Sequence, residues 1–465
     1  MKRLTLTITA LLACAMTFAQ EIPAYYFENG YLESKIEKIK QNIDSADSGV
    51  TFPYLTDGHW RDNGKMSFPL IKHIGEQVKF PFTVYGGDNI FAFGTKDSAM
   101  EEADYYLQAM RDYGTVYGVK GNHDITIRNG WHDHGGYTAT QQEIYDYTTR
   151  PIANLMKGVE GECYYYWDDK KQDVRYIVLD LFENINTSIS WGVNYGFSQK
   201  QADWLVKKAL KCKGKTIVVF THAPIDPKMG GVKEMNFMHE MLIAMQNGEK
   251  FTHNEGVNIK ADFTKSNNTV ACIISGHTHR DESNFERGVL SIGTICDAWY
   301  NDDPKFKHLP RQRNTINEQA FDIMTINTAT KRIHAVRIGQ GEDREWSYHK
   351  EYGGEVWEWS MPTFQSGDLQ VFRSWVMQNV RYPQAAYKNN IQGRVLVEFV
   401  VDKDGNIETD NIKVLQTPHN SLSNEVKRIL YRSPKWIPGS INENPIKVKY
   451  KLPIKFSLQT SLSAM

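Results

Sequence analysis

Apolar runs of about five residues, separated by polar and glycine-rich breaks, recur along residues 48–340. Short apolar runs rich in β-branched and aromatic residues predict buried strands. The five runs that matter most are SGVTFPYLT, KFPFTVYG, GTVYGVK, KTIVVF and NNTVACIIS. Further stretches of this kind lie near 287–296, 320–327 and 331–338. These positions predict at least eight strands.

Segments with helical spacing lie between the runs. We expect an exposed helix over 31–46 and a short helix in PLIKHIGEQV, and further helices over 97–112, Ser198–Lys211 and 234–247. The helix expected over Ser198–Lys211 has a clear apolar set: Trp204, Leu205, Ala209 and Leu210. Strands that alternate with helices indicate an α/β fold with buried sheets.

The pattern changes beyond residue 340. Residues 341–368 are rich in charges, Gly, Trp and Ser, and we expect a linker there. GRVLVEFVVDKDGNI then alternates apolar and polar residues, with Asp404-Gly405 as a turn signal. A helix in LSNEVKRILYRS and a strand in PIKVKYKLPIKFSL complete a small α+β module at 369–465.

The segment 1–19 is typical of a secretory signal peptide. Lys2 and Arg3 precede a mostly apolar stretch, and small Ala19 precedes polar residues. The stretch is shorter than the roughly 20 apolar residues that a membrane span needs, and no later segment qualifies. We expect cleavage after Ala19 and export to the periplasm or the medium. The alternative is a lipoprotein signal in which Cys14 of LLAC is acylated.

Composition adds little to this picture. The chain has 465 residues, 41% hydrophobic and 23% charged, which is ordinary for a globular protein of two domains. The net charge of −1 gives no signature of nucleic-acid binding. Residues 362–465 hold 14 Lys and Arg against 8 Asp and Glu, which indicates either an acidic partner or a chance excess of solvated lysines. Of the four cysteines after Cys14, Cys272 is expected in the core, and no disulfide pairing can be read from their spacing.

Each of the five apolar runs ends in residues that can bind a metal ion. In chain order these are Asp57-Gly58-His59, Gly87-Asp88-Asn89, Gly121-Asn122-His123-Asp124, Thr221-His222-Ala223-Pro224 and Gly276-His277-Thr278-His279. Sites in open α/β sheets form beyond the carboxyl ends of strands. We expect the glycines to permit sharp exits from the strands. In an extended segment His277 and His279 would face one target, whereas a single His-x-His pair is more often two hydrogen-bonded loop histidines.

The ordered set resembles the calcineurin-like metallophosphoesterase superfamily, whose blocks run D-x-H, G-D, G-N-H-[DE], a lone His and G-H-x-H. The resemblance covers roughly residues 48–340, and it implies a four-layer αββα sandwich over residues 20–340. It also implies a metal-dependent phosphoric ester hydrolase in which a metal-bound hydroxide attacks phosphorus. Two divalent ions would be bound, and the mix of N and O ligands suits Mn, Fe or Zn without choosing among them. The substrate class stays open.

The resemblance also assigns roles to individual residues. Asp57, His59 and His279 would bind one ion. Asn122, His222 and His277 would bind the other, and Asp88 would bridge both. His123 would lie beside the phosphate as an acid or charge stabiliser. Many members carry an acid three residues after the bridging aspartate, where this chain has Phe91; this departure leaves the acid role of His123 in question, with Asp124 as a substitute partner.

Some residues near these blocks allow two interpretations of their role. His132 and His134 of WHDHGG would contact substrate or belong to a polar loop. A group of aromatic residues would line a pocket or pack internally: Trp60, Phe91, Phe93, Trp131, Trp299 and Tyr300.

The C-terminal module resembles the C-terminal domain of TonB energy transducers over about residues 370–460. The positions in pattern are Tyr382-Pro383, Gly393, Asp404-Gly405, Pro434-Lys435-Trp436 and Leu452-Pro453. Transducers need a membrane anchor and a Pro-rich spacer, which this sequence does not show. The module is therefore expected to dimerise or to dock an envelope protein by strand addition. Two functions stand: an exported two-metal phosphoesterase, and an envelope binding or transport-accessory protein that uses the phosphatase fold as a scaffold.

Overall fold

The computed structural model describes most of the chain as two compact units. It describes residues 22–44, 49–59, 64–89, 107, 110–128, 136–183, 195–230, 233–298, 311–348, 359–360, 362–365, 369–441 and 444–458. The first unit contains residues up to Tyr26 and Lys35–Gly354, and the second contains Phe27–Ser34 and the chain from Glu355. The segment Phe27–Ser34 therefore groups with the C-terminal unit, although the whole phosphatase-like part of the sequence separates the two.

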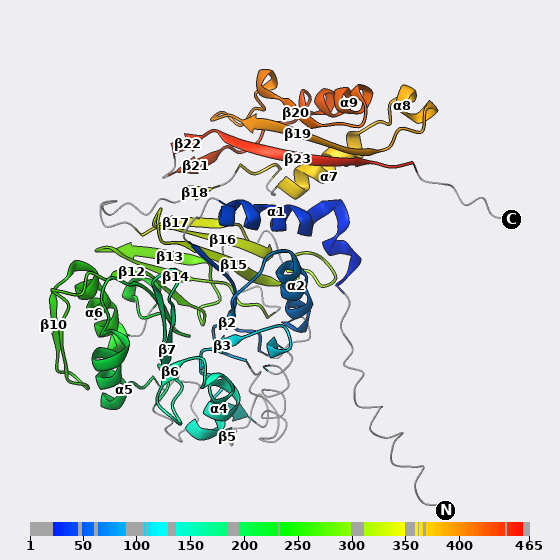
Figure 1. Cartoon of the computed structure of the whole chain (residues 1–465). Helices are drawn as coiled ribbons and strands as arrows, with labels where there is room; N and C mark the ends of the chain where they lie inside the picture. The colour runs from blue at the N-terminus through cyan, green and yellow to red at the C-terminus, as the bar shows by residue number, and fades with distance from the viewer. Residues whose placement is uncertain are drawn as a thin grey trace, which may run out of the picture. The chain divides into compact units, whose positions relative to one another are not determined.

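Two mixed sheets form the first unit (Figure 1). The first sheet has the order β17-β16-β15-β1-β2-β3. Its strands are β1 (Gly49–Leu55), β2 (Thr83–Tyr85), β3 (Val116–Gly118), β15 (Ala320–Asn327), β16 (Arg332–Gly339) and β17 (Arg344–Ser347). The neighbours β1, β2 and β3 are parallel, so their carboxyl ends lie at one edge of the sheet.

The second sheet has the order β13-β14-β12-β9-β8-β7-β6. Its strands are β6 (Lys157–Gly158), β7 (Tyr165–Asp169), β8 (Val174–Val178), β9 (Thr216–Phe220), β12 (Thr269–Ser275), β13 (Glu282–Glu286) and β14 (Val289–Gly293). The strands β8, β9, β12 and β14 are parallel. Two small hairpins add β4 (Thr126–Arg128) with β5 (Gly136–Thr138) and β10 (Lys250–His253) with β11 (Ile259–Asp262).

Aromatic side chains fill the space between the two sheets. The ring centroid of Phe52 on β1 lies 6.0 Å from that of Phe220 on β9, and the ring of Phe82 lies 5.4 Å from that of Trp167 on β7. All four residues belong to one buried cluster with members from both sheets. Burying large rings contributes most of the packing energy in such a core, so this cluster fixes one sheet against the other.

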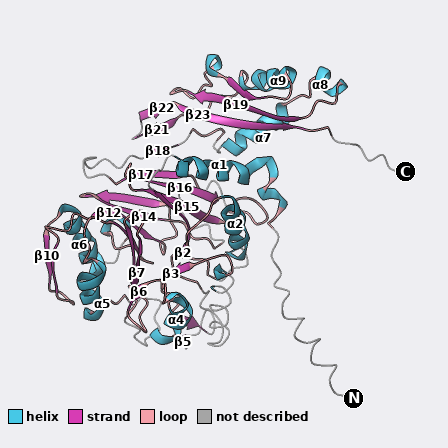
Figure 2. Ribbon diagram, in the orientation of Figure 1, coloured by secondary structure: helices cyan, strands magenta, loops and turns pink. Residues whose placement is uncertain are grey.

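Helices cover the outer faces of the sheets, as Figure 2 shows for α6 beside the second sheet. The helices of this part are α1 (Tyr31–Asp44), of which Tyr31–Ser34 group with the second unit, α2 (Gly64–Gln77), α4 (Gln141–Thr148), α5 (Gln199–Trp204) with a π-helical continuation over Leu205–Ala209, and α6 (Asn236–Asn247). Short 3-10 turns occur at Ala24–Tyr26, Glu28–Gly30, Arg150–Ile152, Pro227–Met229 and Lys233–Met235. The arrangement confirms the predicted α/β sandwich.

The second unit is a small α+β domain. Its main sheet has the order β20-β19-β23, made of β19 (Gly393–Val401), β20 (Lys413–Gln416) and β23 (Val448–Phe456). A second sheet contains β18 (Trp359–Ser360), β21 (Gly439–Ile441) and β22 (Asn444–Ile446). The helices are α7 (Leu369–Asn379), α8 (Gln384–Lys388) and α9 (Asn420–Leu430), with a 3-10 turn at Thr409–Asn411. Trp436, 2% exposed, lies in the core of this unit.

The structure corrects some of the predicted helices and strands and confirms others. The first helix is not exposed throughout, because Leu32 and Ile39 are fully buried. Strand β17 lies inside the segment expected to be a linker, where it completes the first sheet. Cys272 is a buried core residue as predicted, and Cys163, Cys212 and Cys296 are likewise free thiols. The signal-like segment 1–19 and most of the helix expected over 97–112 lie outside the described residues. Among the described helices, none has the length and apolar character that crossing a membrane requires.

Candidate metal centre

The predicted ligands converge because the strands that carry them end at the same edge of the sandwich. Asp57 and His59 follow β1, and Asp88 follows the parallel neighbour β2. Backbone bonds join these two loops, from Asp57 N to Gly87 O at 3.0 Å and from His59 N to Asp88 O at 3.0 Å. In the second sheet, Gly276 N donates to His222 O at 2.9 Å. One further bond joins the two sheets, from His277 N to the Asp57 carboxylate at 3.0 Å.

The ligands themselves make the sharp turns at the strand ends. Five of the seven predicted ligands have a positive φ: Asp57 (53°), His59 (45°), Asp88 (55°), His277 (67°) and His279 (54°). Non-glycine residues rarely adopt this conformation, and each costs of the order of 1 kcal/mol. The segment of His277 and His279 is therefore not extended, and the expectation that both would face one target fails for that reason.

Only one glycine of the blocks has the left-handed backbone that a sharp exit was expected to need. Gly87 alone among them has a positive φ, at 103°. A side chain at Gly121 would overlap the Asp88 carboxylate, and one at Gly276 would overlap Thr56 and the Asp57 carboxylate. These two glycines thus allow neighbouring loops to approach closely, which brings the acids of one block against the backbone of the next.

One group of side chains contains Asp57, His59 and His279. Nε2 of His279 lies 3.3 Å from Asp57 Oδ1 and 3.4 Å from Nε2 of His59. Asp57 Oδ1 is buried and has no hydrogen-bond partner, whereas Asp57 Oδ2 accepts from Thr56 Oγ1 at 2.7 Å. One oxygen of Asp57 is therefore fixed by the protein and the other is available. The potential ligand atoms of these three residues all lie within 4.8 Å of one another.

A second group contains Asp88, His222 and His277, again with ligand atoms within 4.8 Å of one another. Nε2 of His222 lies 3.1 Å from Asp88 Oδ2. His222 Nδ1 lies 2.8 Å from the carbonyl oxygen of Gly86, which leaves Nε2 for a ligand bond. Asn122 Oδ1 is buried without a hydrogen-bond partner. Asp88 also groups with His59 and His123, so its carboxylate lies between both sets.

The unpartnered atoms fit divalent ions. Leaving a buried acceptor without a partner costs about 1–3 kcal/mol, and two such oxygens lie among the predicted ligands: Asp57 Oδ1 and Asn122 Oδ1. Imidazole nitrogen with carboxylate and amide oxygen is a ligand set that Mn, Fe and Zn accept. The chemistry of these donors therefore suits two adjacent ions that share Asp88.

Comparisons with known proteins match this geometry. The family model described as calcineurin-like phosphoesterase matches residues 55–281. The model described as the Gram-negative bacterial TonB protein C-terminal matches residues 378–458. The chain carries a calcineurin-like phosphoesterase domain. The second match identifies a TonB-type C-terminal domain after it, and this domain type is periplasmic. The phosphoesterase match indicates a metal-dependent phosphoester hydrolase.

Solved structures with similar folds are distant in sequence. A dimetal phosphatase from Danio rerio is 15% identical, with 64% of this chain and 99% of that chain covered at a TM-score of 0.43. A phosphopantetheinyl hydrolase from Mycobacterium tuberculosis is 14% identical, with coverages of 54% and 90% and a TM-score of 0.28. The TonB C-terminal domain of Helicobacter pylori is 26% identical, with coverages of 20% and 82% and a TM-score of 0.17. No curated protein sequence matches the chain.

The electrostatics of the phosphoesterase site keep its acids ionised. Burial alone would raise the pKa of Asp88 and Asp57, but the charge of His222 and its histidine neighbours outweighs burial and lowers both pKa values. Burial lowers the pKa of His59 to about 3 and that of His277 to about 4. Both rings are therefore neutral near pH 7, which is the form that binds metal ions.

His222 behaves differently from the other histidines of the phosphoesterase site. Burial would lower its pKa, but the carboxylates of Asp88 and Asp57 raise it to about 9. The ring is consequently protonated at neutral pH when no ion is bound. An ion must displace this proton, so metal binding at the site should release protons to the solvent.

Asp124 lies where it supports the backbone of the phosphoesterase site. Its carboxylate accepts from Gly121 N at 2.8 Å, from Asn89 N at 2.8 Å and from Asn89 Nδ2 at 3.0 Å. Burial and the neighbouring charge of Asp88 raise its pKa to about 6. These bonds tie the second block to the third. We therefore regard Asp124 as a positioning residue, whereas His123 lies half-buried with its ring 4.7 Å from that of His59.

Two contacts at the site were not foreseen from sequence. The hydroxyl of Tyr195 lies 3.0 Å from Nε2 of His277. Lys120 directly precedes the third block in sequence. Its Nζ pairs with Asp180 at 2.5 Å, and both side chains are fully buried. Tyr195 belongs to no motif, and Lys120 and Asp180 are far apart in the sequence, so no local pattern could have revealed either contact.

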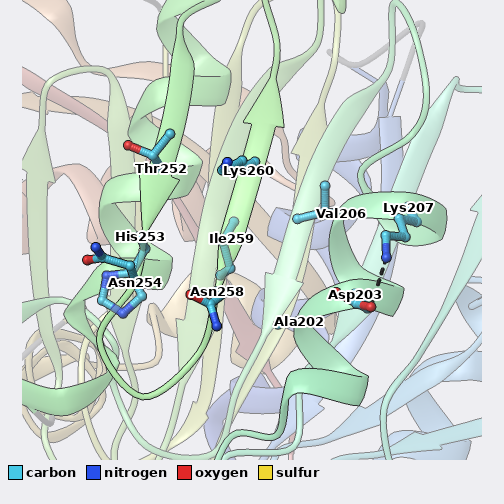
Figure 3. A pocket seen from close by; sticks show the side chains of 10 residues that line it. All are labelled: Ala202, Asp203, Val206, Lys207, Thr252, His253, Asn254, Asn258, Ile259 and Lys260. Carbon is cyan, nitrogen blue, oxygen red and sulfur yellow. Dashed lines mark hydrogen bonds and ion pairs between the residues drawn. The ribbon is translucent and has the colours of Figure 1, made fainter.

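The described cavity is lined by none of the predicted ligands. The positions Trp60, Phe91, Phe93, Trp131, His132, His134, Trp299 and Tyr300 lie outside the described residues. A cavity of about 410 Å³ lies between α5 with its π-helical continuation and the β10–β11 hairpin (Figure 3). Its lining includes Asp203, Lys207 and Lys260, and no predicted ligand belongs to it.

Proposed function

We propose that the chain is an exported two-metal phosphoesterase whose C-terminal domain docks a protein partner. The observation that supports the catalytic part is the convergence of six of the seven predicted ligands, together with two buried oxygens, Asp57 Oδ1 and Asn122 Oδ1, that have no hydrogen-bond partner. When bound, two divalent ions would supply charge stabilisation to phosphate oxygens and a water of lowered pKa. Asp57, His59 and His279 would hold one of them. Asn122, His222 and His277 would hold the other, with Asp88 between.

His123 would act on the substrate directly in this proposal. Its backbone N–H donates to Asp88 Oδ1 at 2.8 Å, which fixes the residue beside the bridging acid. Its ring lies next to His59 and is half-buried, so it can meet a phosphate that enters from solvent. A side chain at this place can protonate a leaving oxygen or stabilise charge on phosphate.

The test is a hydrolysis assay on full-length protein. The protein is stripped with chelator, reloaded with Mn²⁺ or Zn²⁺ and given p-nitrophenyl phosphate as a monoester and bis(p-nitrophenyl) phosphate as a diester. Hydrolysis of either substrate that disappears on chelation and returns on reloading supports the proposal. Two bound ions without turnover of either substrate would contradict it and would favour a binding protein built on the phosphatase fold.

The C-terminal domain supports the docking part of the proposal. Among the described strands, β23 lies at one edge of its sheet, and it is nine residues long. Lys449, Lys451 and Lys455 project from it as exposed residues. An edge strand of this length offers a row of backbone groups to an added strand, and its lysines favour an acidic partner. Replacing Lys449 and Lys451 by Glu should weaken capture of that partner from an envelope extract without changing hydrolysis.

The export part rests on the signal-like segment 1–19. Cleavage after Ala19 would leave Gln20 as the first residue of the mature protein. N-terminal sequencing of protein from the periplasmic fraction tests this directly. Incorporation of a labelled fatty acid that depends on Cys14 would instead support the lipoprotein alternative.

A further inference from the structure

A third cluster of metal-binding side chains lies outside the phosphoesterase centre. Asp226, His239 and Glu286 place their potential ligand atoms within 4.8 Å of one another. Asp226 lies in the loop after β9, His239 on α6 and Glu286 at the end of β13. Asp226 and His239 are each 1% exposed, and Glu286 is half-buried.

His239 is the most informative residue of the cluster, because both of its ring nitrogens are buried without a hydrogen-bond partner. A buried imidazole normally donates from one nitrogen and accepts at the other. Here Nε2 points at Asp226 Oδ2 from 3.4 Å, and the contact does not meet the geometry of a hydrogen bond. An ion bound at one of these nitrogens would supply the partner that the protein does not.

The spacing of these atoms is that of two ligands on one ion. Nitrogen and oxygen ligands at about 2.0–2.2 Å from Zn²⁺, arranged tetrahedrally, lie about 3.3–3.6 Å apart. The distance of 3.4 Å between His239 and Asp226 falls in this range. It is also close to the 3.1 Å and 3.3 Å histidine–carboxylate distances in the phosphoesterase centre.

The other contacts of the cluster leave room for an ion. Asp226 Oδ1 accepts from the backbone N of Lys228 at 2.9 Å, and Asp226 Oδ2 accepts from Asn284 Nδ2 at 2.9 Å. Each carboxylate oxygen has two lone pairs, so Oδ2 retains one. Lys228 Nζ lies 3.4 Å from Glu286 Oε2, but its side chain is 61% exposed and can turn to solvent. Two carboxylates and one neutral imidazole would then face one divalent charge.

We infer that Asp226, His239 and Glu286 form a third divalent-cation site, with Zn²⁺ as the expected occupant. Asp226 follows the predicted ligand His222 by four residues, and β13 begins three residues after His279. An ion in this site would therefore join the loop after His222 to β13, the strand that follows His279. Its role would be to hold these loops in place, and no ligand of the phosphoesterase centre takes part in it.

The experiment counts zinc on full-length protein by elemental analysis after stripping, reloading and desalting. Glu286→Gln is the main variant, because Glu286 is half-buried and the change keeps its shape. His239→Leu is the second variant. We expect each to bind one equivalent fewer than the unaltered protein. His253→Gln is the matched control, because His253 is a histidine outside the cluster that bonds to Glu255 O, and it should bind the unaltered number.

A second set of measurements uses protein in which the two-metal centre is disabled, so that zinc bound at the third site can be counted alone. Asp57→Asn with Asp88→Asn should disable the two-metal centre, and the remaining zinc should then fall from one equivalent to none when Glu286→Gln is added. In the same background, zinc should raise the melting temperature only while Glu286 is present. Equal zinc content with and without Glu286→Gln, or no zinc-dependent rise in melting temperature, would overturn the inference whatever the catalytic result.

Discussion

Replacement of Arg337 should destabilise the phosphoesterase domain strongly, although Arg337 touches no predicted ligand. Arg337 is fully buried on β16. Its Nε donates to Asp322 on β15 at 2.9 Å, and its two terminal nitrogens donate to Asp281 at 2.9 and 2.7 Å. Asp281 follows His279 by two residues. The guanidinium thus joins the first sheet to the loop that carries two predicted ligands.

The size of the effect follows from what Arg337→Met leaves behind. Methionine retains most of the apolar stem but removes the charge and five donors. Asp281 and Asp322 would stay buried, with Arg344 as their remaining cationic partner. Breaking a buried ion pair by removing one member costs about 3–5 kcal/mol. Partial compensation by Arg344 places the expected loss near 3 kcal/mol, or roughly 5–10 °C in melting temperature for a domain of this size.

Arg332→Met on the same strand is the control. Arg332 pairs with Glu345, and both side chains are partly exposed, at 54% and 28%. Pairs of this kind contribute about 0–1 kcal/mol. Urea denaturation of both variants, monitored by circular dichroism, measures the difference. A loss below about 1 kcal/mol for Arg337→Met, the level of an exposed pair, or an equal loss for both variants, would refute the reasoning.

The effect of Arg337→Met should also depend on pH. Burial would raise the pKa of Asp281 and Asp322, but Arg337 and Arg344 outweigh burial and lower both pKa values. A carboxylate with a lowered pKa in the folded state contributes stability above its unfolded pKa of about 4, and this contribution is lost as the pH falls. The difference between the unaltered protein and Arg337→Met should therefore be largest near pH 6–7 and should shrink below pH 4.

Three further changes test the proposed catalytic centre. Asp88→Asn removes the one negative charge placed between both ligand groups, so the protein should lose at least one bound ion and its activity; retention of both ions with normal kcat would contradict the bridging role. His123→Asn leaves all seven ligands, so metal content should stay unaltered while kcat falls by about 10²–10⁴; loss of metal would show that His123 is a ligand. A chain of residues 20–361 should hydrolyse phosphoesters at the full-length rate, because every predicted ligand precedes residue 280; a soluble, metal-loaded but inactive product would show that the C-terminal domain is required.

The strands of the phosphoesterase domain could be predicted because their signal is local. The apolar runs before Asp57 and His277 are continuous and buried on both sides, and both became strands of the sandwich. The helix expected over Ser198–Lys211 also formed, with a π-helical second half that no periodicity indicates. The family resemblance supplied the roles of individual residues, since each role depends on which strands are neighbours.

Contacts between distant segments could not be predicted from the sequence. Asp124 binds the backbone of Asn89 because β2 and β3 are adjacent, and nothing near Asp124 in sequence indicates this. Arg337 and Asp281 meet although they lie on separate strands and loops, far apart along the chain. The grouping of Phe27–Ser34 with the C-terminal unit depends likewise on tertiary packing. The residue types indicate which side chains can donate or accept a hydrogen bond, but only the fold determines which of them bond to each other.

The backbone of the ligands shows why two sheets can share one centre. A parallel strand that continued straight beyond its end would carry its side chains away from the opposite sheet. The left-handed conformation at Asp57 and Asp88 in the first sheet, and at His277 in the second, turns the chain shortly after it leaves the strand. The cost of about 1–2 kcal/mol for each left-handed residue is smaller than that of ordering a loop longer by several residues, because each added residue costs about 1–2 kcal/mol to fix. Short strained turns are therefore the less costly way to bring the predicted ligands of the two sheets together, and bonds such as His277 N to Asp57 hold the loops there.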